Sequence, residues 1–445
     1  MRSLLILNII AVSVLGCRSP SVTDQKEGGV TPSGSGGARL DSSPTSEVAK
    51  ARPPVRNVIL LSIDSLRADM PWAGYPRPIA PRITEFAKRS VTYTHAYSVS
   101  SYTSMSLGGL LAGRFPSELK RSGFFFGSYA KENLFFPELL QAAHIKTLGA
   151  HAHGYFKDAG FEQGFDRWEI VPNLKWNNTT DENVTSPAHE AIAERLLSDA
   201  GDGPFFAWFH FLDPHDQYIS HEKEGIPPFG AAPRDRYDAE VLFTDRYVGK
   251  LLDFIAEKPW AKETAIILTA DHGEAFGEHG QSAHGFELWE NLVRVPLIVN
   301  LPGNSPRVVD VPRSAIDIAP TILSLFHLPA ESTFVGVDLT PEFYGAPAPP
   351  RDVLLDLPMT SDNDRRRALL HGTKKVIAFG TDSVTKVFDV AEDPGELSPL
   401  KSDESAKEAI VRFQEASKGV HDTPPTRCNV GCLNGAYAKP KESSP

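Results

Sequence analysis

The chain has 445 residues, of which 41% are hydrophobic and 23% are charged, and its formal net charge is −11. These values describe a globular protein with a large core and room for two or three packed units. The acidic balance excludes nucleic-acid binding through a broad basic surface, so any site for an anion must be locally basic.

The first predicted element is an export signal, residues 1–17. Arg2 supplies a positive charge, and the apolar run Leu4–Gly16 is too short to span a membrane comfortably. The sequence VLGC that ends at Cys17 resembles the lipobox of bacterial lipoproteins, which implies cleavage before Cys17 and attachment of lipid to it. A plain signal peptide is the alternative. Arg18 in the next position implies a lipid-anchored protein of the bacterial outer membrane, facing the periplasm or the cell surface.

A polar stretch rich in Gly, Ser and Pro, residues 18–54, predicts a flexible tether that cannot bury a core. Beyond it, Arg56–Ile63 is apolar enough for a strand buried on both faces, and Asp64 stands at its end. Apolar periodicity predicts a helix around 79–90, and the small-residue run 106–112 indicates the start of another.

The central region alternates predicted helices with predicted strands. The strands are expected over 145–149, 204–212, 265–268 and 295–300, and the helices over 135–143, 189–198 and 236–258. Such alternation indicates an α/β fold with a large, mostly parallel sheet flanked by helices. We assign this main domain to residues 55–344.

The composition of the sequence changes after residue 345. A Pro-rich segment there precedes three short expected strands, 352–357, 374–379 and 386–390. They predict a small antiparallel subdomain, 345–420, that packs on the main sheet, and a polar tail, 421–445, ends the chain. The tail holds Cys428 and Cys432. Two thiols without further ligands make a poor zinc site, so a small-loop disulfide formed in an oxidising compartment is expected.

Acidic and imidazole side chains stand at the ends of three predicted strands. The groups are Asp64 after 56–63, Asp213 with His215 after 204–212, and Asp271 with His272 after 265–268. The carboxyl ends of parallel strands meet at one sheet edge, where α/β proteins bind ligands, and both residue types bind divalent cations. A single such acid could be a helix cap, but three strand ends together indicate a metal site.

The hydroxyl-rich segment Ser100–Arg114 supplies candidates for a nucleophile. A hydroxyl at a helix N-terminus would have its alkoxide and an anionic substrate stabilised by the positive end of the helix dipole. For most of these serines, capping of the helix is the simpler role.

Taken in chain order, these segments resemble the sulfatase family of the alkaline-phosphatase-like superfamily. The matching segments are NVILLSIDSLRAD (57–69), 103–114, HFLDPHDQY (210–218), TADHGEAFGEHG (269–280), HGFELWENLVRVPLIV (284–299) and FDVAEDPGE (388–396). The resemblance implies an alkaline-phosphatase-like α/β fold, with the main domain as the catalytic one. It also implies a metal-dependent hydrolase of sulfate or phosphate esters.

The family register places Thr103 at the nucleophile position, ten residues before Gly113, and Ser106 at the motif serine. Met105 and Leu107 replace the motif proline and arginine, and Ile63 stands where many sulfatases have an aspartate. Because Thr103 replaces the Cys or Ser that is oxidised to formylglycine, no formylglycine is expected. The chain is similar to the family's threonine-using branch, which includes phosphoglycerol and phosphoethanolamine transferases.

The resemblance implies that one divalent cation (Ca, Mg, Mn or Zn) is held by Asp64, Thr103, Asp271 and His272. It also implies that His215 and His284 bind the anionic oxygens of the substrate or protonate the departing alkoxide.

Other residues receive smaller roles. We expect Asp213 to shape its loop, and Arg67 and Arg294 to pair with structural acids. His151 and His153 lie near the family's active-site Lys/His segment in an ambiguous register, and His279 serves or caps its loop. We therefore predict an enzyme in which Thr103 attacks sulfur or phosphorus in line. The alternatives are a headgroup transferase and a non-catalytic lipoprotein that retains the fold.

Overall fold

The structure is a computed structural model that describes residues 53–426 except 125, 176–182, 362 and 402. The export signal, Cys17, nearly all of the tether, Cys428 and Cys432 lie outside the described residues. Among the described residues, no helix combines the length and apolar character needed to cross a membrane.

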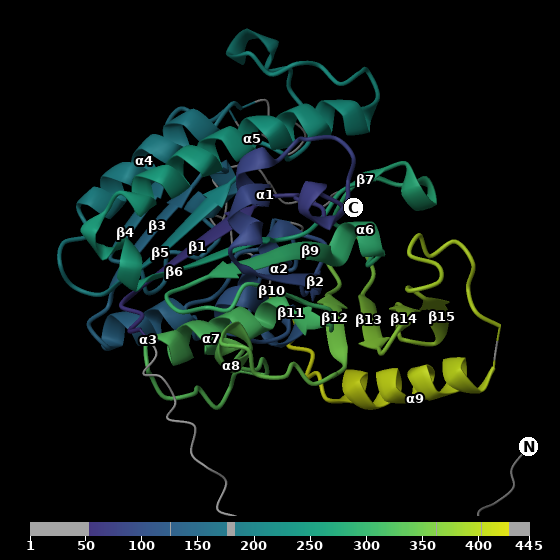
Figure 1. Ribbon diagram of the computed structural model, residues 1–445. Coiled ribbons are helices and arrows are strands. Elements are labelled where there is room, and N and C mark those ends of the chain that lie inside the picture. Colours follow the sequence, from purple (N-terminus) through teal and green to yellow (C-terminus); the bar gives the residue numbers. More distant parts are fainter. Residues whose placement is uncertain (1–52, 125, 176–182, 362, 402, 427–445) are drawn as a thin grey trace, which may run out of the picture. The chain divides into compact units, whose positions relative to one another are not determined.

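A central sheet organises the main domain. Its strands are β1 (Asn57–Ile63), β2 (Val91–Tyr97), β3 (Lys146–His151), β4 (Arg167–Ile170), β5 (Phe205–Phe211), β6 (Thr264–Ala270), β9 (Arg294–Asn300), β10 (Arg307–Val309) and β11 (Arg313–Ser314). Their order is β10-β2-β9-β6-β1-β5-β3-β4, with β11 also paired to β2 (Figure 1). Strand β9 is antiparallel to β2 and β6, and the other neighbouring pairs are parallel. The expected mostly parallel sheet is confirmed.

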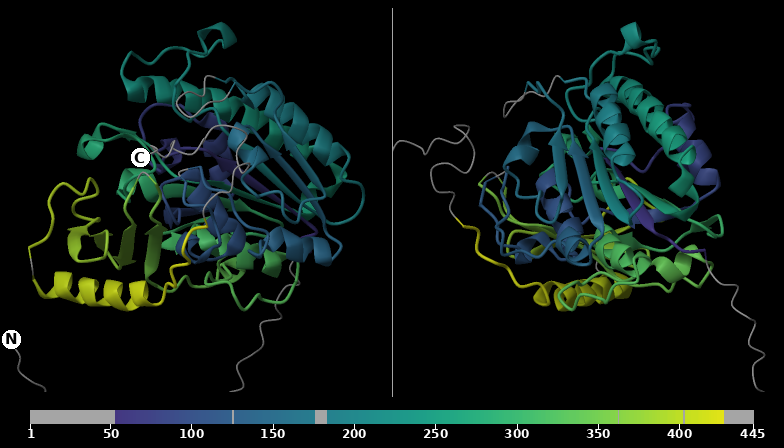
Figure 2. Two further views of the ribbon diagram at one scale, coloured as in Figure 1. Left: turned by 180° about the vertical axis from the view of Figure 1, so that it is seen from behind. Right: turned by 90° about the vertical axis from the view of Figure 1, so that its left-hand side faces the viewer.

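Helices cover both faces of this sheet (Figure 2). On one face lie α1 (Pro81–Lys88), α4 (Ser186–Ser198) and α5 (Pro233–Ala256), and on the other α2 (Thr103–Ala112), α3 (Phe136–Ala142) and α7 (Ile318–Leu325). Alternate residues of β1 divide between the two cores: Ile59 and Leu61 face α4 and α5, whereas Val58 and Leu60 face α2 and α7. Every residue of β1, β5 and β6 is buried, which explains why their sequences are mostly apolar.

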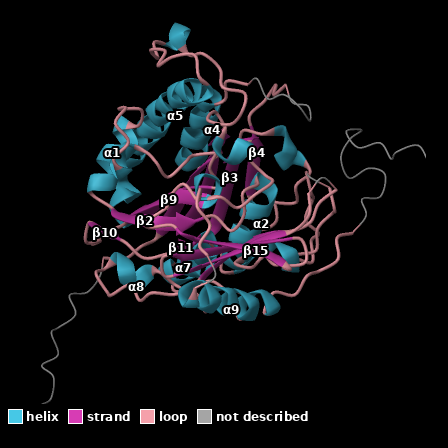
Figure 3. Cartoon of the chain, turned by 90° about the vertical axis from the view of Figure 1, so that its right-hand side faces the viewer, coloured by secondary structure: helices cyan, strands magenta, loops and turns pink. Residues whose placement is uncertain are grey.

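A second sheet forms the C-terminal part of the described chain. It contains β12 (Val353–Leu357), β13 (Arg366–His371), β14 (Lys374–Phe379) and β15 (Val384–Asp389), all antiparallel in that order. Helix α9 (Glu404–Lys418) packs on one face (Figure 1, Figure 3). The other face packs against Tyr97, Met105 and the helix α6 (Glu290–Val293) of the main domain. The expected small antiparallel sheet is confirmed, with β13 as a further strand.

The sequence did not predict β2, β13, α7 or α9. Strand β2 mixes Thr and His with aromatic residues and shows no continuous apolar run, because only part of it is buried. Helix α2 begins at Thr103, three residues before the expected start at 106. Residues 421–426 of the predicted tail are bonded to the main domain, where Thr423 N–H donates to Ser117 O at 2.7 Å.

The buried His189 of α4 makes stability depend on pH. Its Nε2 lies 2.9 Å from Ala150 O, and burial lowers the pKa of His189 to about 3. The pKa of His189 in the folded protein lies below its ordinary value of about 6.5, so the unfolded protein gains a proton first as the pH falls. The free energy of unfolding is therefore not reduced by His189 above pH ~6.5, and it decreases as the pH falls toward 3. We expect His189→Gln to remove up to about 1.4 kcal/mol per pH unit from the slope of unfolding free energy between pH 6 and pH 4. Denaturant titrations across this range test it, and identical slopes for both proteins would contradict it.

Candidate active site

The predicted site residues meet at the carboxyl edge of the central sheet. Strand β1 lies between β5 and β6, with Ile63 paired to Phe211 and to Ala270. The polar groups that follow these three strands therefore start from adjacent positions. Asp64 comes directly after β1, the Asp213–His215 turn after β5, and Asp271 with His272 after β6. Helix α2 brings Thr103 to the same edge.

Of the four residues expected to bind a cation, three surround the imidazole of the fourth, His272. Its Nε2 lies 3.5 Å from Asp64 Oδ1, 3.4 Å from Asp271 Oδ2 and 3.0 Å from Thr103 Oγ1. Ligand atoms of Asp64, Asp271 and His272 all lie within 4.8 Å of one another, and the three residues are buried. The structure thus brings the predicted ligands together.

The donor set fits a divalent cation. His272 Nδ1 lies 2.9 Å from Gly273 O, and because a carbonyl only accepts, Nδ1 carries the proton and Nε2 presents a lone pair. Asp271 Oδ1 accepts bonds from Ser65 N–H at 3.2 Å and His272 N–H at 2.9 Å. Asp271 Oδ2 is buried and has no hydrogen-bond partner among the described residues. A cation between Asp271 Oδ2 and His272 Nε2, which lie 3.4 Å apart, would satisfy both atoms at once.

Burial and neighbouring charges perturb these groups strongly. Burial and the nearby Asp64 carboxylate hold the pKa of Asp271 well above its ordinary value. Burial also opposes ionisation of Asp64, but His215, His210 and His272 outweigh it and lower the pKa of Asp64. Burial and the charge of His284 hold the pKa of His272 well below its ordinary value, so its imidazole stays neutral. A neutral imidazole is the form that binds a metal.

A close backbone approach shapes the turn that carries Asp271 and His272. Gly273 N–H donates to Leu292 O at 2.7 Å, and Glu274 N–H to Asn291 O at 3.0 Å. A Cβ atom on Gly273 would lie 2.1 Å from Asn291 O, so only glycine fits there. The segment at α6 therefore fixes the backbone of the turn that carries Asp271 and His272.

Thr103 is the first residue of α2, and its side chain is half-buried. The backbone N–H groups of the first helical turn lack intrahelical acceptors, and such groups are suited to bind an anion. Ser106 is buried and donates to Ser100 O at 2.6 Å, so its hydroxyl serves the helix start. Met105 and Leu107, at the positions of the family's proline and arginine, are buried in the cores.

His215 and His284 flank the cluster as expected. The ring centroid of His284 lies 4.1 Å from that of His272 and 4.9 Å from that of His215. His284 Nδ1 is 3.2 Å from Glu274 Oε1. Burial alone would lower the pKa of His284, but the buried Glu274 carboxylate outweighs it and raises this pKa. Glu274 therefore favours the protonated form of His284, beside His272.

His151 and His153 lie in different surroundings. The His153 ring centroid is 6.1 Å from that of His215, and burial lowers the pKa of His153 to about 3. His151 instead lies on the core side of β3, 4.6 Å from Phe156, 4.0 Å from Trp168 and 4.4 Å from Trp208 between ring centroids. His153 therefore lies beside His215, whereas His151 is enclosed by aromatic rings of the core.

Most of the smaller expectations hold. Asp213 accepts bonds from Thr185 and Ser186 at the start of α4, which is the loop-shaping role expected. Arg67 pairs with Asp69 at 2.8 Å and Glu278 at 2.7 Å. Arg294 Nε donates to Thr94 O at 2.8 Å, and a hydrogen bond from Thr94 together with the charge of Arg294 helps to lower the pKa of the nearby Asp310. His279 stacks on Trp289 with ring centroids 3.9 Å apart, outside the cluster.

Sequence reasoning missed two residues of the site, Glu274 and His210. Glu274 had a usable signal, because it follows the Asp-His-Gly turn directly. His210 had none, because it is embedded in the apolar strand β5. Its Nε2 lies 3.3 Å from Asp64 Oδ2.

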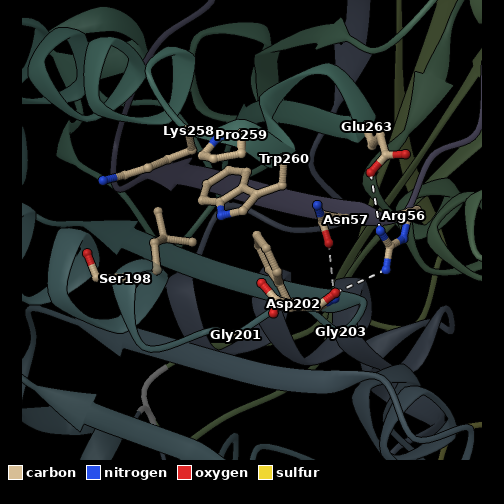
Figure 4. Close-up of a pocket in the computed structure, with 12 residues that line it drawn as sticks. Arg56, Asn57, Ser198, Gly201, Asp202, Gly203, Lys258, Pro259, Trp260 and Glu263 are labelled. Atoms are coloured by element: carbon tan, nitrogen blue, oxygen red, sulfur yellow. Dashed lines mark hydrogen bonds and ion pairs between the residues drawn. The ribbon is translucent and has the colours of Figure 1, made fainter.

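Two cavities help to locate the substrate. One of about 360 Å³ is lined by Asp216, Gln217, Tyr218, Arg236, Phe276 and Ser282, next to His215 and close to His284 in the chain. The other, of about 460 Å³, lies around Arg56, Lys258 and Trp260 at the amino ends of β1, β5 and β6 (Figure 4). This second cavity lies at the ends of the strands opposite the cluster, whereas the first is lined by Asp216, Ala275 and Ala283, the chain neighbours of His215, Glu274 and His284.

Known proteins resemble this chain. The sequence profile of the family named Sulfatase matches residues 56–328. The chain is 24% identical over 345 residues to an ulvan-active sulfatase of Formosa agariphila, covering 66% of this chain and 66% of the relative. It is 22% identical to a choline-sulfatase of Rhizobium meliloti, covering 77% of this chain and 82% of the relative.

The fold is also found among solved structures. A phosphonate monoester hydrolase of Agrobacterium radiobacter superposes with a TM-score of 0.65 at 16% identity, covering 82% of this chain and 95% of that chain. The architecture is therefore the expected alkaline-phosphatase-like α/β fold. The matched profile includes every residue of the cluster, from Asp64 to His284. The chain belongs to the sulfatase family of ester-hydrolysing enzymes.

Proposed function

We propose that this protein hydrolyses sulfate esters with Thr103 as the nucleophile and one divalent cation held by Asp64, Asp271, His272 and Thr103. The observation that carries the proposal is the 3.0 Å contact between Thr103 Oγ1 and His272 Nε2 inside the buried Asp–Asp–His cluster. A threonine hydroxyl is a weak nucleophile by itself. When bound, the cation would lower the pKa of this hydroxyl and offset the charge on the transferred group.

The residues of the chain supply the remaining steps. The N–H groups at the start of α2 bind the oxygens of the sulfate. The Thr103 hydroxyl gives its proton to solvent, and Oγ1 attacks the sulfur opposite the leaving oxygen. The S–O bond to the alcohol breaks as a threonyl sulfate forms, and water then cleaves that ester. The departing alcohol would occupy the cavity between Tyr218, Arg236 and Phe276.

His284 is placed to act as the general acid for the leaving alcohol. Its Nδ1 faces Glu274, and the raised pKa of His284 keeps the ring protonated nearer to neutral pH. The Nε2–H is then available to the departing alkoxide.

This role predicts a dependence on the leaving group. A p-nitrophenolate leaves readily without a proton, whereas an alkoxide needs one. We therefore expect His284→Gln to lower kcat for an alkyl sulfate by about 10²–10⁴-fold, the usual contribution of a general acid, and to lower kcat for p-nitrophenyl sulfate much less. Steady-state kinetics on both esters measure the effect. Equal losses on the two esters would assign His284 to binding and not to protonation.

Thr103 also favours a second candidate, the hydrolysis of phosphate or phosphonate esters. A formylglycine hydrate can expel sulfate by elimination, whereas a threonine ester must be broken by an incoming nucleophile. Alkoxide nucleophiles are well suited to phosphoryl groups. Transfer to a second alcohol in place of water would make the protein a transferase.

The proposal is tested on full-length protein that is stripped with a chelator and reloaded with Ca²⁺, Mg²⁺, Mn²⁺ or Zn²⁺. Each form is assayed with p-nitrophenyl sulfate, phosphate, phosphodiester and phosphonate. We expect cation-dependent hydrolysis with sulfate preferred. Preference for a phosphorus ester selects the second candidate, and a protein that neither binds a cation nor hydrolyses any ester supports the non-catalytic alternative.

We also propose a localisation from the predicted export signal: cleavage before Cys17 and lipidation of Cys17 anchor the protein to the outer membrane. The tether 18–54 then separates the catalytic domain 55–344 from the bilayer. Mass spectrometry of the mature N-terminus tests this, because a diacylglyceryl adduct on Cys17 is expected and an unmodified or internal N-terminus would contradict it.

A further inference from the structure

A buried hydrogen-bond chain runs from the core to Asp64. Trp208 Nε1 lies 2.8 Å from Ser62 Oγ, which lies 2.7 Å from His210 Nδ1. His210 Nε2 in turn lies 3.3 Å from Asp64 Oδ2. Ser62 and His210 are register partners on β1 and β5, and all four residues are buried.

The donor and acceptor of each hydrogen bond in this chain follow from Trp208. The indole of Trp208 can only donate, so Ser62 Oγ accepts from it and its own proton is free for His210 Nδ1. His210 Nδ1 is then an acceptor, and the neutral ring carries its proton on Nε2. The opposite tautomer would set an Nε2 lone pair against the Asp64 carboxylate in a site closed to water, which costs free energy. His210 therefore donates to Asp64 Oδ2.

This bond decides which oxygen of Asp64 faces the cluster. With Oδ2 held by His210, Oδ1 is the oxygen that lies 3.5 Å from His272 Nε2 and 3.1 Å from Ser65 Oγ. No metal-ligand residue contributes to the chain other than Asp64 itself. The hydrogen-bond chain therefore contacts the cluster only through Asp64, from the side of the core.

We propose that His210 is a positioning residue, held in its Nε2–H tautomer by Trp208 and Ser62, which orients Asp64 so that Oδ1 is presented to the cation. The inference rests on the proposed function, because it requires that the cluster binds a cation. Hydrogen bonds to metal-binding carboxylates commonly contribute 10–100-fold in metal affinity or activity.

The test compares two substitutions of His210 in the full chain. His210→Gln keeps an N–H donor at the distance of Nε2, whereas His210→Leu has similar bulk and no donor. We measure the Mn²⁺ dissociation constant of chelator-stripped protein by calorimetric titration. His210→Leu is expected to weaken Mn²⁺ binding by about 10–100-fold, and His210→Gln is expected to restore most of that loss.

A matched control separates positioning from general damage. His189 is equally buried, but it donates to Ala150 O and packs on Phe211 without a hydrogen bond to Asp64, so His189→Leu is expected to leave Mn²⁺ affinity unchanged. Wild-type affinity in His210→Leu, or equal losses in His189→Leu and His210→Leu, would overturn the inference. Where His210→Leu does not fold, Ser62→Ala removes only the hydroxyl that sets the tautomer. It is expected to weaken Mn²⁺ binding severalfold, and unchanged affinity would overturn the inference.

Failure of this inference can be distinguished from failure of the proposed function. The readout is cation affinity, whereas the proposed function is judged by Thr103-dependent ester hydrolysis. A protein that hydrolyses esters through Thr103 and tolerates His210→Leu without loss of affinity would retain the function and lose only the inference. A wild-type protein that binds none of Ca²⁺, Mg²⁺, Mn²⁺ and Zn²⁺ would overturn both.

Discussion

Replacing Thr103 by alanine is expected to abolish ester hydrolysis and to leave the fold intact. Loss of the attacking hydroxyl removes the covalent route, and removal of a nucleophile in other hydrolases lowers kcat by as much as ~10⁶-fold. We expect a loss of at least ~10³-fold here. Asp64, Asp271 and His272 remain in place in Thr103→Ala, so the cation should still bind, although with one ligand fewer.

The controls for this prediction lie in the same helix. Thr103→Ser keeps the hydroxyl and is expected to retain activity within about tenfold, because only a methyl group is lost. Ser106→Ala removes a hydroxyl that bonds to Ser100 O and should change the rate little. Wild-type protein quenched during turnover should carry a sulfuryl or phosphoryl adduct on Thr103, and accurate mass separates the two. A Thr103→Ala protein as fast as wild type would eliminate the covalent mechanism.

The central sheet and most of the cluster could be predicted because their signals are local. Strands buried on both faces must be almost wholly apolar, so β1, β5 and β6 stand out as continuous runs. The polar residue that ends each run is then placed at the sheet edge by the chain itself. Asp64, Asp271 and His272 therefore needed no knowledge of long-range contacts, and the family register supplied Thr103.

The residues that escaped prediction depend on tertiary contacts. His210 lies inside an apolar strand, and its role arises only because β1 pairs with β5 and brings Ser62 and Asp64 beside it. Strand β13 was missed because Arg366 and Arg367 obscure its pattern. Arg366 pairs with Glu287, and Arg367 is buried against Asp356 at 3.0 Å. Charges that are neutralised by distant partners cannot be distinguished from surface charges in a sequence.

The same kind of tertiary contact joins the C-terminal sheet to the active site. Lys375 of β14 is fully buried, and its Nζ lies 2.9 Å from Glu290 Oε1 and 2.9 Å from Glu396 Oε1. Tyr97 also donates to Glu290 at 3.1 Å. Glu290 begins α6, the segment that clamps the turn of Asp271 and His272 through its backbone. The ion cluster of Lys375, Glu290 and Glu396 thus connects the second sheet to the turn that carries Asp271 and His272.

Lys375→Met is therefore expected to destabilise the protein by about 3–5 kcal/mol, because it leaves two buried carboxylates without their cation. Burial raises the pKa of Glu396 to about 7 even with Lys375 present. Since this folded pKa exceeds the ordinary value of about 4.3, Glu396 favours folding at low pH, and its ionisation costs stability as the pH rises through 7. Lys375 offsets that cost, so the deficit of the variant should be larger at pH 8 than at pH 5.5.

Denaturant unfolding of Lys375→Met at both pH values measures this deficit, and the neighbouring lysine provides the control. Lys374 pairs with Asp389 at a partly exposed position, so Lys374→Met should cost no more than about 1 kcal/mol. Because α6 holds Gly273 and Glu274, we also expect Lys375→Met to weaken cation binding, whereas Lys374→Met should not. Equal stability losses in the two variants, or a larger deficit at pH 5.5, would show that the buried ion cluster does not couple the second sheet to the site.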